Sequence, residues 1–139
     1  MKKLLFFAAL PLLAFASCNK CDDHDVRINT FSATVNRSTF TANETTWFHI
    51  NKVLDIEGKS GNKTIHLTLP RYSGTGSYDL GAIQKGATYR DNTIEYTASR
   101  GTLIITADND RKLQGTFSFD AASGGEQKKV ESGSFTFYK

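Results

Sequence analysis

The sequence predicts a single all-β domain, built as an antiparallel β-sandwich or a meandering barrel of roughly eight to ten short strands. Three observations predict this fold class. Apolar and polar residues alternate with a period of two through residues 28–139, Gly, Asn and Asp recur between the alternating runs, and no long segment repeats its apolar residues at the helical period. The sandwich is the preferred form, and the choice depends on whether the first and last strands pair.

Four alternating segments make up the first half of the domain, and each is expected to be a strand: residues 31–35, 40–42, 48–56 and 65–69. The first two form a predicted hairpin. In the third, the apolar even positions, from Phe48 and Ile50 to Leu54 and Ile56, are expected to face the core. A polar turn is predicted over residues 58–63. Beyond Pro70, which ends the fourth segment, Tyr89 is the expected inward anchor of an irregular stretch.

The last third of the chain is the most regular part. Residues 94–98 and 103–107 alternate, Asp108-Asn109-Asp110 predicts a turn, and residues 113–121 form the returning strand.

One phrase recurs three times in this region, each time as glycine, hydroxyl residue and then alternating apolar residues. The copies are Gly101-Thr102-Leu103-Ile104-Ile105, Gly115-Thr116-Phe117-Ser118-Phe119 and Gly133-Ser134-Phe135-Thr136-Phe137. We interpret them as successive strands of one meander, in which each glycine is a bulge or a site of close approach. Val130 lies on the opposite parity from Phe135, and a bulge near Gly133 would restore it to the core face.

The N-terminus reads as an export signal. Lys2 and Lys3 precede an apolar run, Leu4–Phe15, which is shorter than a membrane-spanning helix. The following Ala16-Ser17-Cys18 resembles the bacterial lipobox, with Phe15 where that motif prefers Leu. The resemblance implies that Cys18 receives lipid and that the chain is cut before it, so that the mature chain is tethered to a membrane without spanning it.

We therefore divide the chain into a lipoprotein signal peptide (1–17), a flexible acidic tether (18–27) and a β domain (28–139). Lys20 with Asp22-Asp23 looks like the surface-export signal of Bacteroidota lipoproteins, which leaves the cell surface and the periplasmic face both open. Cys21 is the only thiol left once Cys18 is acylated, so no internal disulfide is expected. Consecutive tether residues such as Cys21 and His24 form a poor metal cage, and no metal or cofactor is predicted.

The chain as a whole resembles a group of small Bacteroidota outer-membrane lipoproteins of uncharacterised function. The resemblance is carried by the lipobox, the early Phe31–Asn36 strand, the Tyr78–Gly81 turn and the Gly115–Ala121 strand. It implies an all-β fold and an outer-membrane address, and it supplies no catalytic residues.

Three residues are candidates for function. Trp47 falls on the parity opposite to Phe48, where it either marks a recognition surface or packs beneath residues 43–45. His49 and His66 fall on the polar parity of their strands. If those strands pair, the histidines would lie near one another and near Asp55 or Glu57, as in a metal or acid–base site.

The excess of 17 Lys and Arg over 14 Asp and Glu largely disappears when Lys2 and Lys3 leave with the signal, so no nucleic-acid partner is predicted. No catalytic signature is found, and we predict that the protein is not an enzyme. The favoured function is a lipid-anchored, non-catalytic binding module with a protein or glycan partner. The alternatives are a small-ligand-binding barrel and a metal- or His/carboxylate-dependent enzyme.

Overall fold

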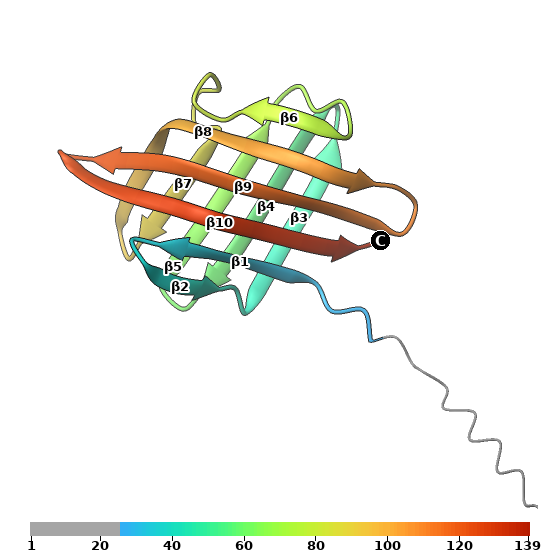
Figure 1. Ribbon diagram of the computed structural model, residues 1–139, viewed down its shortest axis with the longest axis horizontal. Helices are drawn as coiled ribbons and strands as arrows, with labels where there is room; N and C mark the ends of the chain where they lie inside the picture. Colours follow the sequence, from blue (N-terminus) through green and yellow to red (C-terminus); the bar gives the residue numbers. More distant parts are fainter. Residues whose placement is uncertain (1–25) are drawn as a thin grey trace, which may run out of the picture.

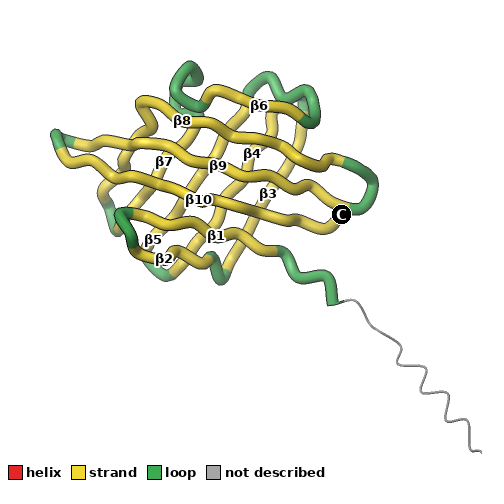
Figure 2. The backbone as a smooth tube through the Cα atoms, in the orientation of Figure 1, coloured by secondary structure: helices red, strands yellow, loops and turns green. Residues whose placement is uncertain are grey.

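The computed structural model describes residues 26–139, which form ten β-strands joined by short turns (Figure 2). The strands are β1 (Thr30–Val35), β2 (Ser38–Thr41), β3 (Glu44–Ile50), β4 (Val53–Ser60), β5 (Lys63–Leu69), β6 (Gly76–Asp79), β7 (Ala87–Asp91), β8 (Ile94–Asp108), β9 (Lys112–Ser123) and β10 (Glu126–Tyr138). Between residues 26 and 139 there is no helix with the length and apolar character needed to cross a membrane. The predicted signal peptide, Cys18 and most of the tether lie outside the described residues.

All pairings are antiparallel, and the strands follow the order β2-β1-β10-β9-β8-β7-β5-β4-β3, with β6 added to β8. This confirms the all-β prediction. Figure 1 shows two layers: β6, β8, β9, β10 and β1 form the front layer, and β7, β5, β4 and β3 cross behind it. Both layers belong to one curled sheet, because β8 pairs with β7 and β1 pairs with β10. The two edges, β2 and β3, are consecutive in the chain.

Aromatic rings fill the space between the layers. Phe31 lies with its ring centroid 5.1 Å from Phe117 and 6.3 Å from Phe135, and Phe135 is 5.2 Å from Phe137. Leu54 and Ile56 of the back layer are fully buried against them. Tyr89, the predicted anchor, is also buried. The interior is therefore a packed core.

The recurring glycines lie directly opposite phenylalanines of the neighbouring strands. Gly101 is paired with Phe119, Gly115 with Phe135 and Gly133 with Phe117. A Cβ atom at Gly115 would stand 2.7 Å from the Phe135 ring, and one at Gly133 would overlap the Phe117 ring. The prediction that these glycines are sites of close approach is confirmed.

Gly133 also follows a β-bulge. The register between β10 and β9 shifts between Val130 and Gly133, and Ser132 has a φ of 50°. As a result Val130 and Phe135 are both buried despite their opposite parity, which confirms the predicted bulge.

Residues 48–56, predicted as one strand, form two. β3 ends at Ile50, and Asn51 and Lys52, with φ of 51° and 65°, make the two-residue hairpin turn that leads into β4. The predicted polar turn over 58–63 is likewise narrower, because β4 continues to Ser60.

The hairpin turn reverses the faces expected for β3. Trp47 lies opposite the buried Ile56 and therefore faces inward, whereas Phe48 lies opposite Asp55 on the outer face. Phe48 and Ile50 are 48% and 60% exposed. The prediction that Phe48 and Ile50 face the core is wrong, because it assumed that a single strand, with one alternation of faces, runs through residues 51 and 52.

Replacing Gly133 tests the contact between glycine and ring. Gly133→Ala should lower the free energy of unfolding by about 1–3 kcal/mol, because the added methyl group overpacks the Phe117 ring. Phe117→Leu should destabilise as well, but the double variant should lose less than the sum of the two single losses. Urea unfolding measures all three variants, with Ser118→Ala on the exposed face as a control. Additive losses would contradict the contact.

Candidate functional site

The outer face of the back layer brings His66 close to carboxylates. His66 on β5 lies opposite Glu57 on β4, and Thr68 lies opposite Asp55. In the next strand, Phe48 lies opposite Asp55 on the same face. Residues directly opposite each other in a sheet share a face, so these side chains form one surface. We call the residues Phe48, Ile50, Asp55, His66 and Thr68 the β3–β5 face.

Asp55 is the centre of this face. Its Oδ1 atom lies 2.5 Å from Nε2 of His66, and Thr68 donates its hydroxyl to Oδ2 at 3.1 Å. The Asp55 side chain is 18% exposed and that of His66 is 35% exposed. Both carboxylate oxygens are engaged, which holds the imidazole in one orientation while leaving part of it open to solvent.

A hollow of about 360 Å³ adjoins His66, with walls from β4, β5, β7, β8 and the loop before β7. At its rim, Glu95 accepts hydrogen bonds from Arg90 at 2.8 Å and from Lys85 at 3.1 Å. These bonds, with that from Arg90 first, hold the pKa of Glu95 below its ordinary value. The rim therefore carries positive and negative side chains that are fixed by hydrogen bonds. It extends the polar part of the β3–β5 face.

The other side of the β3–β5 face is apolar. Phe48 and Ile50 project from β3, which is an edge strand of the sheet, next to the Asp55 network. A large apolar side chain beside fixed hydrogen-bonding groups is the arrangement that protein and glycan recognition surfaces use. Sequence reasoning missed Phe48 and Ile50 as surface residues, and the Asn51-Lys52 turn was the signal that would have found them.

The polar half of this face offers hydrogen bonds. Within residues 26–139, no three His, Cys, Asp or Glu side chains are grouped so as to hold a metal ion. His66 and Asp55 form a dyad whose carboxylate is already shared with Thr68.

Trp47 occupies a different place from the one predicted. Its ring stacks on Phe137, with centroids 6.2 Å apart and planes 16° apart, and the Lys139 ammonium lies 5.9 Å from it. Trp47 thus packs half-buried between β3 and the end of β10. The expectation that it faces away from the core is wrong, because it depended on the parity of residues 48–56. Of the two alternatives, packing is the one that the structure supports, and the ring that Trp47 packs on is Phe137.

His49 is also on the inner side of β3. It lies opposite the buried Leu54, and its ring meets Tyr72 edge-on at 5.0 Å. His66 is two strands away, on the outer face, because β4 lies between β3 and β5. The predicted pairing of His49 with His66 is therefore wrong, whereas the proximity of His66 to Asp55 is confirmed.

A second polar cluster closes the end of the core next to His49. Asp108 accepts hydrogen bonds from the Tyr72 hydroxyl and from the Lys139 ammonium, both at 2.6 Å. Burial alone would raise the pKa of Asp108, but these two bonds outweigh it and hold the pKa below its ordinary value. Burial and the Asp108 bond raise the pKa of Tyr72. The cluster fastens the C-terminus to the end of β8.

Comparison with known proteins places the β domain in a family. A family model described as a domain of unknown function, DUF6252, matches residues 28–139. No curated protein and no solved structure shows significant similarity to the chain.

The Asp108 cluster predicts a specific acid response. A carboxylate whose pKa is lowered in the folded state adds stability above its unfolded pKa, near 3.9, and loses that contribution as the pH falls through the folded pKa. Asp108→Asn should therefore cost about 1–3 kcal/mol at neutral pH and flatten the loss of stability below about pH 4. Denaturant unfolding across pH 2.5–7 measures it, with exposed Asp110→Asn in the same turn as the control. An equal effect of both substitutions would contradict the assignment.

Proposed function

This chain belongs to the DUF6252 family, and we propose that it is a lipid-anchored, non-catalytic binding module of the bacterial cell envelope. In this proposal Cys18 carries the lipid that tethers the chain to the outer membrane, and the β3–β5 face engages a protein or glycan partner. Its role is recognition at a membrane-tethered position.

The observation that carries the binding role is the exposure of Phe48 and Ile50 on an edge strand. Edge strands are commonly protected by charged residues or proline, but β3 carries a single charged residue, Glu44, at its beginning. Phe48 instead stands 48% exposed beside Asp55, whose orientation is fixed by His66 and Thr68. Apolar anchors flanked by ordered polar groups favour a partner that covers this face.

The packing of the interior favours a surface function over a ligand enclosed at the centre, between the two layers. Phe31, Phe117 and Phe135 lie in mutual contact between the layers. The described hollow beside His66 opens on the outer face, where a partner can reach it. The His66–Asp55 dyad contributes fixed hydrogen-bonding groups in this proposal.

The anchoring role is supported by the sequence Ala16-Ser17-Cys18 and by its position before the domain. The described chain begins with Val26, which is 73% exposed, and the first strand starts at Thr30. A lipid on Cys18 would therefore be separated from the first strand by a short stretch of chain.

A photo-crosslinking experiment tests the binding face. A photoreactive phenylalanine analogue at position 48 should give a defined adduct in intact cells, because the side chain would be covered by the partner. Ile104, 42% exposed on the outer face of the front layer, is the matched control position. Adducts from both positions alike, or none from position 48, would contradict the proposal. If an adduct forms, Ile50→Ser should reduce it.

Labelled-palmitate incorporation tests the anchor. Cys18→Ala should abolish labelling and release the chain from the membrane fraction, because acylation requires that thiol. Cys21→Ala removes the other cysteine of the tether and should leave labelling unchanged. Labelling that persists in Cys18→Ala would contradict the proposed lipid anchor, but it would not bear on the binding role proposed for the β3–β5 face.

A further inference from the structure

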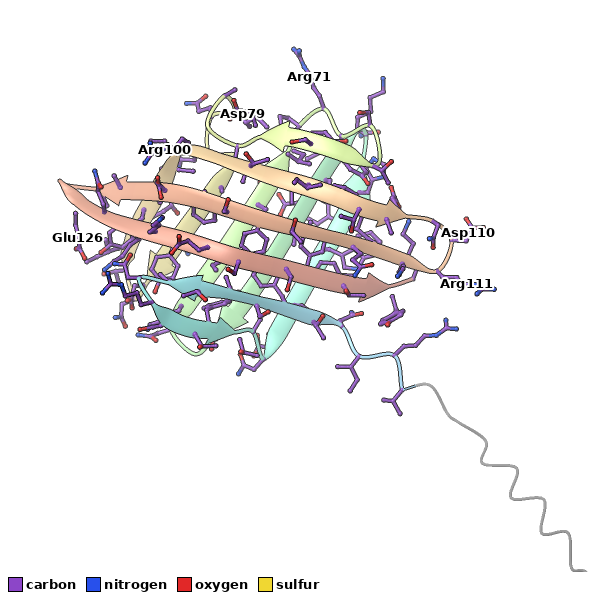
Figure 3. The ribbon with its side chains drawn as sticks, in the orientation of Figure 1. Arg71, Asp79, Arg100, Asp110, Arg111 and Glu126 are labelled. Atoms are coloured by element: carbon purple, nitrogen blue, oxygen red, sulfur yellow. The ribbon has the colours of Figure 1, made fainter. Side chains whose placement is uncertain are left out.

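A hollow of about 390 Å³ lies at the end of the molecule where Glu126 is labelled in Figure 3. Its walls come from both layers, with β1, β2 and β10 on one side and β4, β5 and β7 on the other. Asp110 and Arg111 mark the opposite end in the same view, beside the Asp108 cluster. The hollow is therefore the mouth of the interior at the end away from the C-terminus.

The register of the strands directs polar residues into this mouth. Lys63 lies opposite Ser60 on one side and opposite Asp91 on the other, so all three share the inner face of the back layer. In the front layer, Lys128 lies opposite Ala121, which is buried in the core. The inward rows that are apolar through the core thus end in Ser, Lys and Asp at this mouth.

The floor of the hollow is aromatic. Phe40 and Tyr89 line it and are 3% and 2% exposed. The Tyr89 hydroxyl lies 3.5 Å from the Asp91 carboxylate, and burial, followed by the charge of Asp91, raises the pKa of Tyr89 to about 12. The hydroxyl accordingly keeps its proton at neutral pH and donates it to Asp91, which leaves its oxygen as an acceptor.

Lys128, on the front-layer wall of the hollow, is fixed in place and still has free hydrogen-bond donors. Its side chain is 19% exposed, and its ammonium bonds to Glu126 at 2.5 Å and lies 5.1 Å from the Tyr96 ring. Tyr96 donates its hydroxyl to the second oxygen of Glu126 at 2.8 Å. An ammonium has three donors, so Lys128 can bond a ligand while keeping Glu126.

The charges at this mouth balance. Lys63, Lys128 and Asp91 line the hollow, and Glu126 pairs with Lys128 beside it, so that two carboxylates offset the two ammonium groups. The remaining polar side chains of the lining are hydroxyls and amides, from Asn36, Ser38, Thr39, Ser60 and Asn62. Paired donors and acceptors match the hydroxyl groups of a sugar, and the buried rings of Phe40 and Tyr89 close the hollow beneath them.

We propose that this hollow is a binding site for a neutral polyhydroxylated molecule the size of one sugar ring. Ligand pockets span roughly 300–1,000 Å³, and this volume lies near the lower limit, which fits a single ring better than a longer chain. The site lies on the inner side of the sheet, whereas the β3–β5 face lies on the outer side of the back layer. It is thus a second site and does not depend on the function proposed for that face.

Saturation-transfer NMR on the full chain, kept in a detergent without sugar headgroups, tests the site. The neutral probes are glucose, galactose, mannose and N-acetylglucosamine, and the charged probes are glucuronate and inorganic phosphate. At least one neutral probe should bind saturably with a Kd in the millimolar range, as expected for a few hydrogen bonds at an open site.

Two lysines that face the hollow and two neighbouring lysines that face outward provide matched variants. Lys63→Met and Lys128→Met should weaken binding about tenfold, because each removes a charged donor. Lys59→Met and Lys129→Met remove the same charge from neighbouring outward positions and should leave binding unchanged. Ser38→Trp, at an exposed position of the rim, should block the hollow without disturbing the core.

The outcomes separate clearly. Saturable binding of a neutral sugar that is lost in the inward variants and in Ser38→Trp supports the site. Binding of phosphate or glucuronate alone would overturn it in favour of an anion site. Binding that all the variants retain, or no saturable binding by any neutral probe, would also overturn it. Thermal unfolding of each variant shows whether a loss of binding reflects a loss of fold.

Discussion

The fold depends on the contact between phenylalanine rings and the glycines opposite them. The rings of Phe117 and Phe135 each lie over a glycine of a neighbouring strand, and the ring of Phe31 reaches across to Gly58 of the back layer in the same way. Because glycine has no Cβ, a ring can lie flat on the sheet and fill the space that two smaller side chains would otherwise occupy. Large rings thus pack the space between the two layers of a small domain at high density.

Each end of this aromatic core carries a carboxylate that accepts hydrogen bonds from a tyrosine and a lysine. At one end Asp108 receives hydrogen bonds from Tyr72 and Lys139, and at the other Glu126 receives them from Tyr96 and Lys128. Each tyrosine has its ring against the core and its hydroxyl at the boundary with water, so its polar atom is satisfied where the apolar packing ends. The ends differ in openness, because a hollow adjoins Lys128 whereas Trp47 and Phe137 pack against the end near Lys139.

Much of the fold follows from local patterns in the sequence. Alternation identified most strands, the recurring glycines were correctly assigned to close approach, and the parity of Val130 located the bulge in β10. The candidate site was harder to predict, because it depends on which strands become neighbours. The faces of Trp47 and Phe48 were reversed by a turn of two residues, a change that alternation alone does not register. The clusters at the two ends join residues such as Tyr72 and Lys139, whose proximity is set by the curl of the sheet.

The pairing of β1 with β10 joins the beginning of the domain to its end. Thr30 lies opposite Thr136, and Val35 lies opposite Val130, so β1 has only the short β2 as a partner until the last strand is present. Contacts between such distant residues form slowly, because a long loop must close first. A chain that emerges from a ribosome or a translocation pore from its N-terminus therefore cannot complete this sheet early. Phe31 lacks its contacts with Phe117 and Phe135 until the last strand of the domain is available, so the domain cannot complete its core before then.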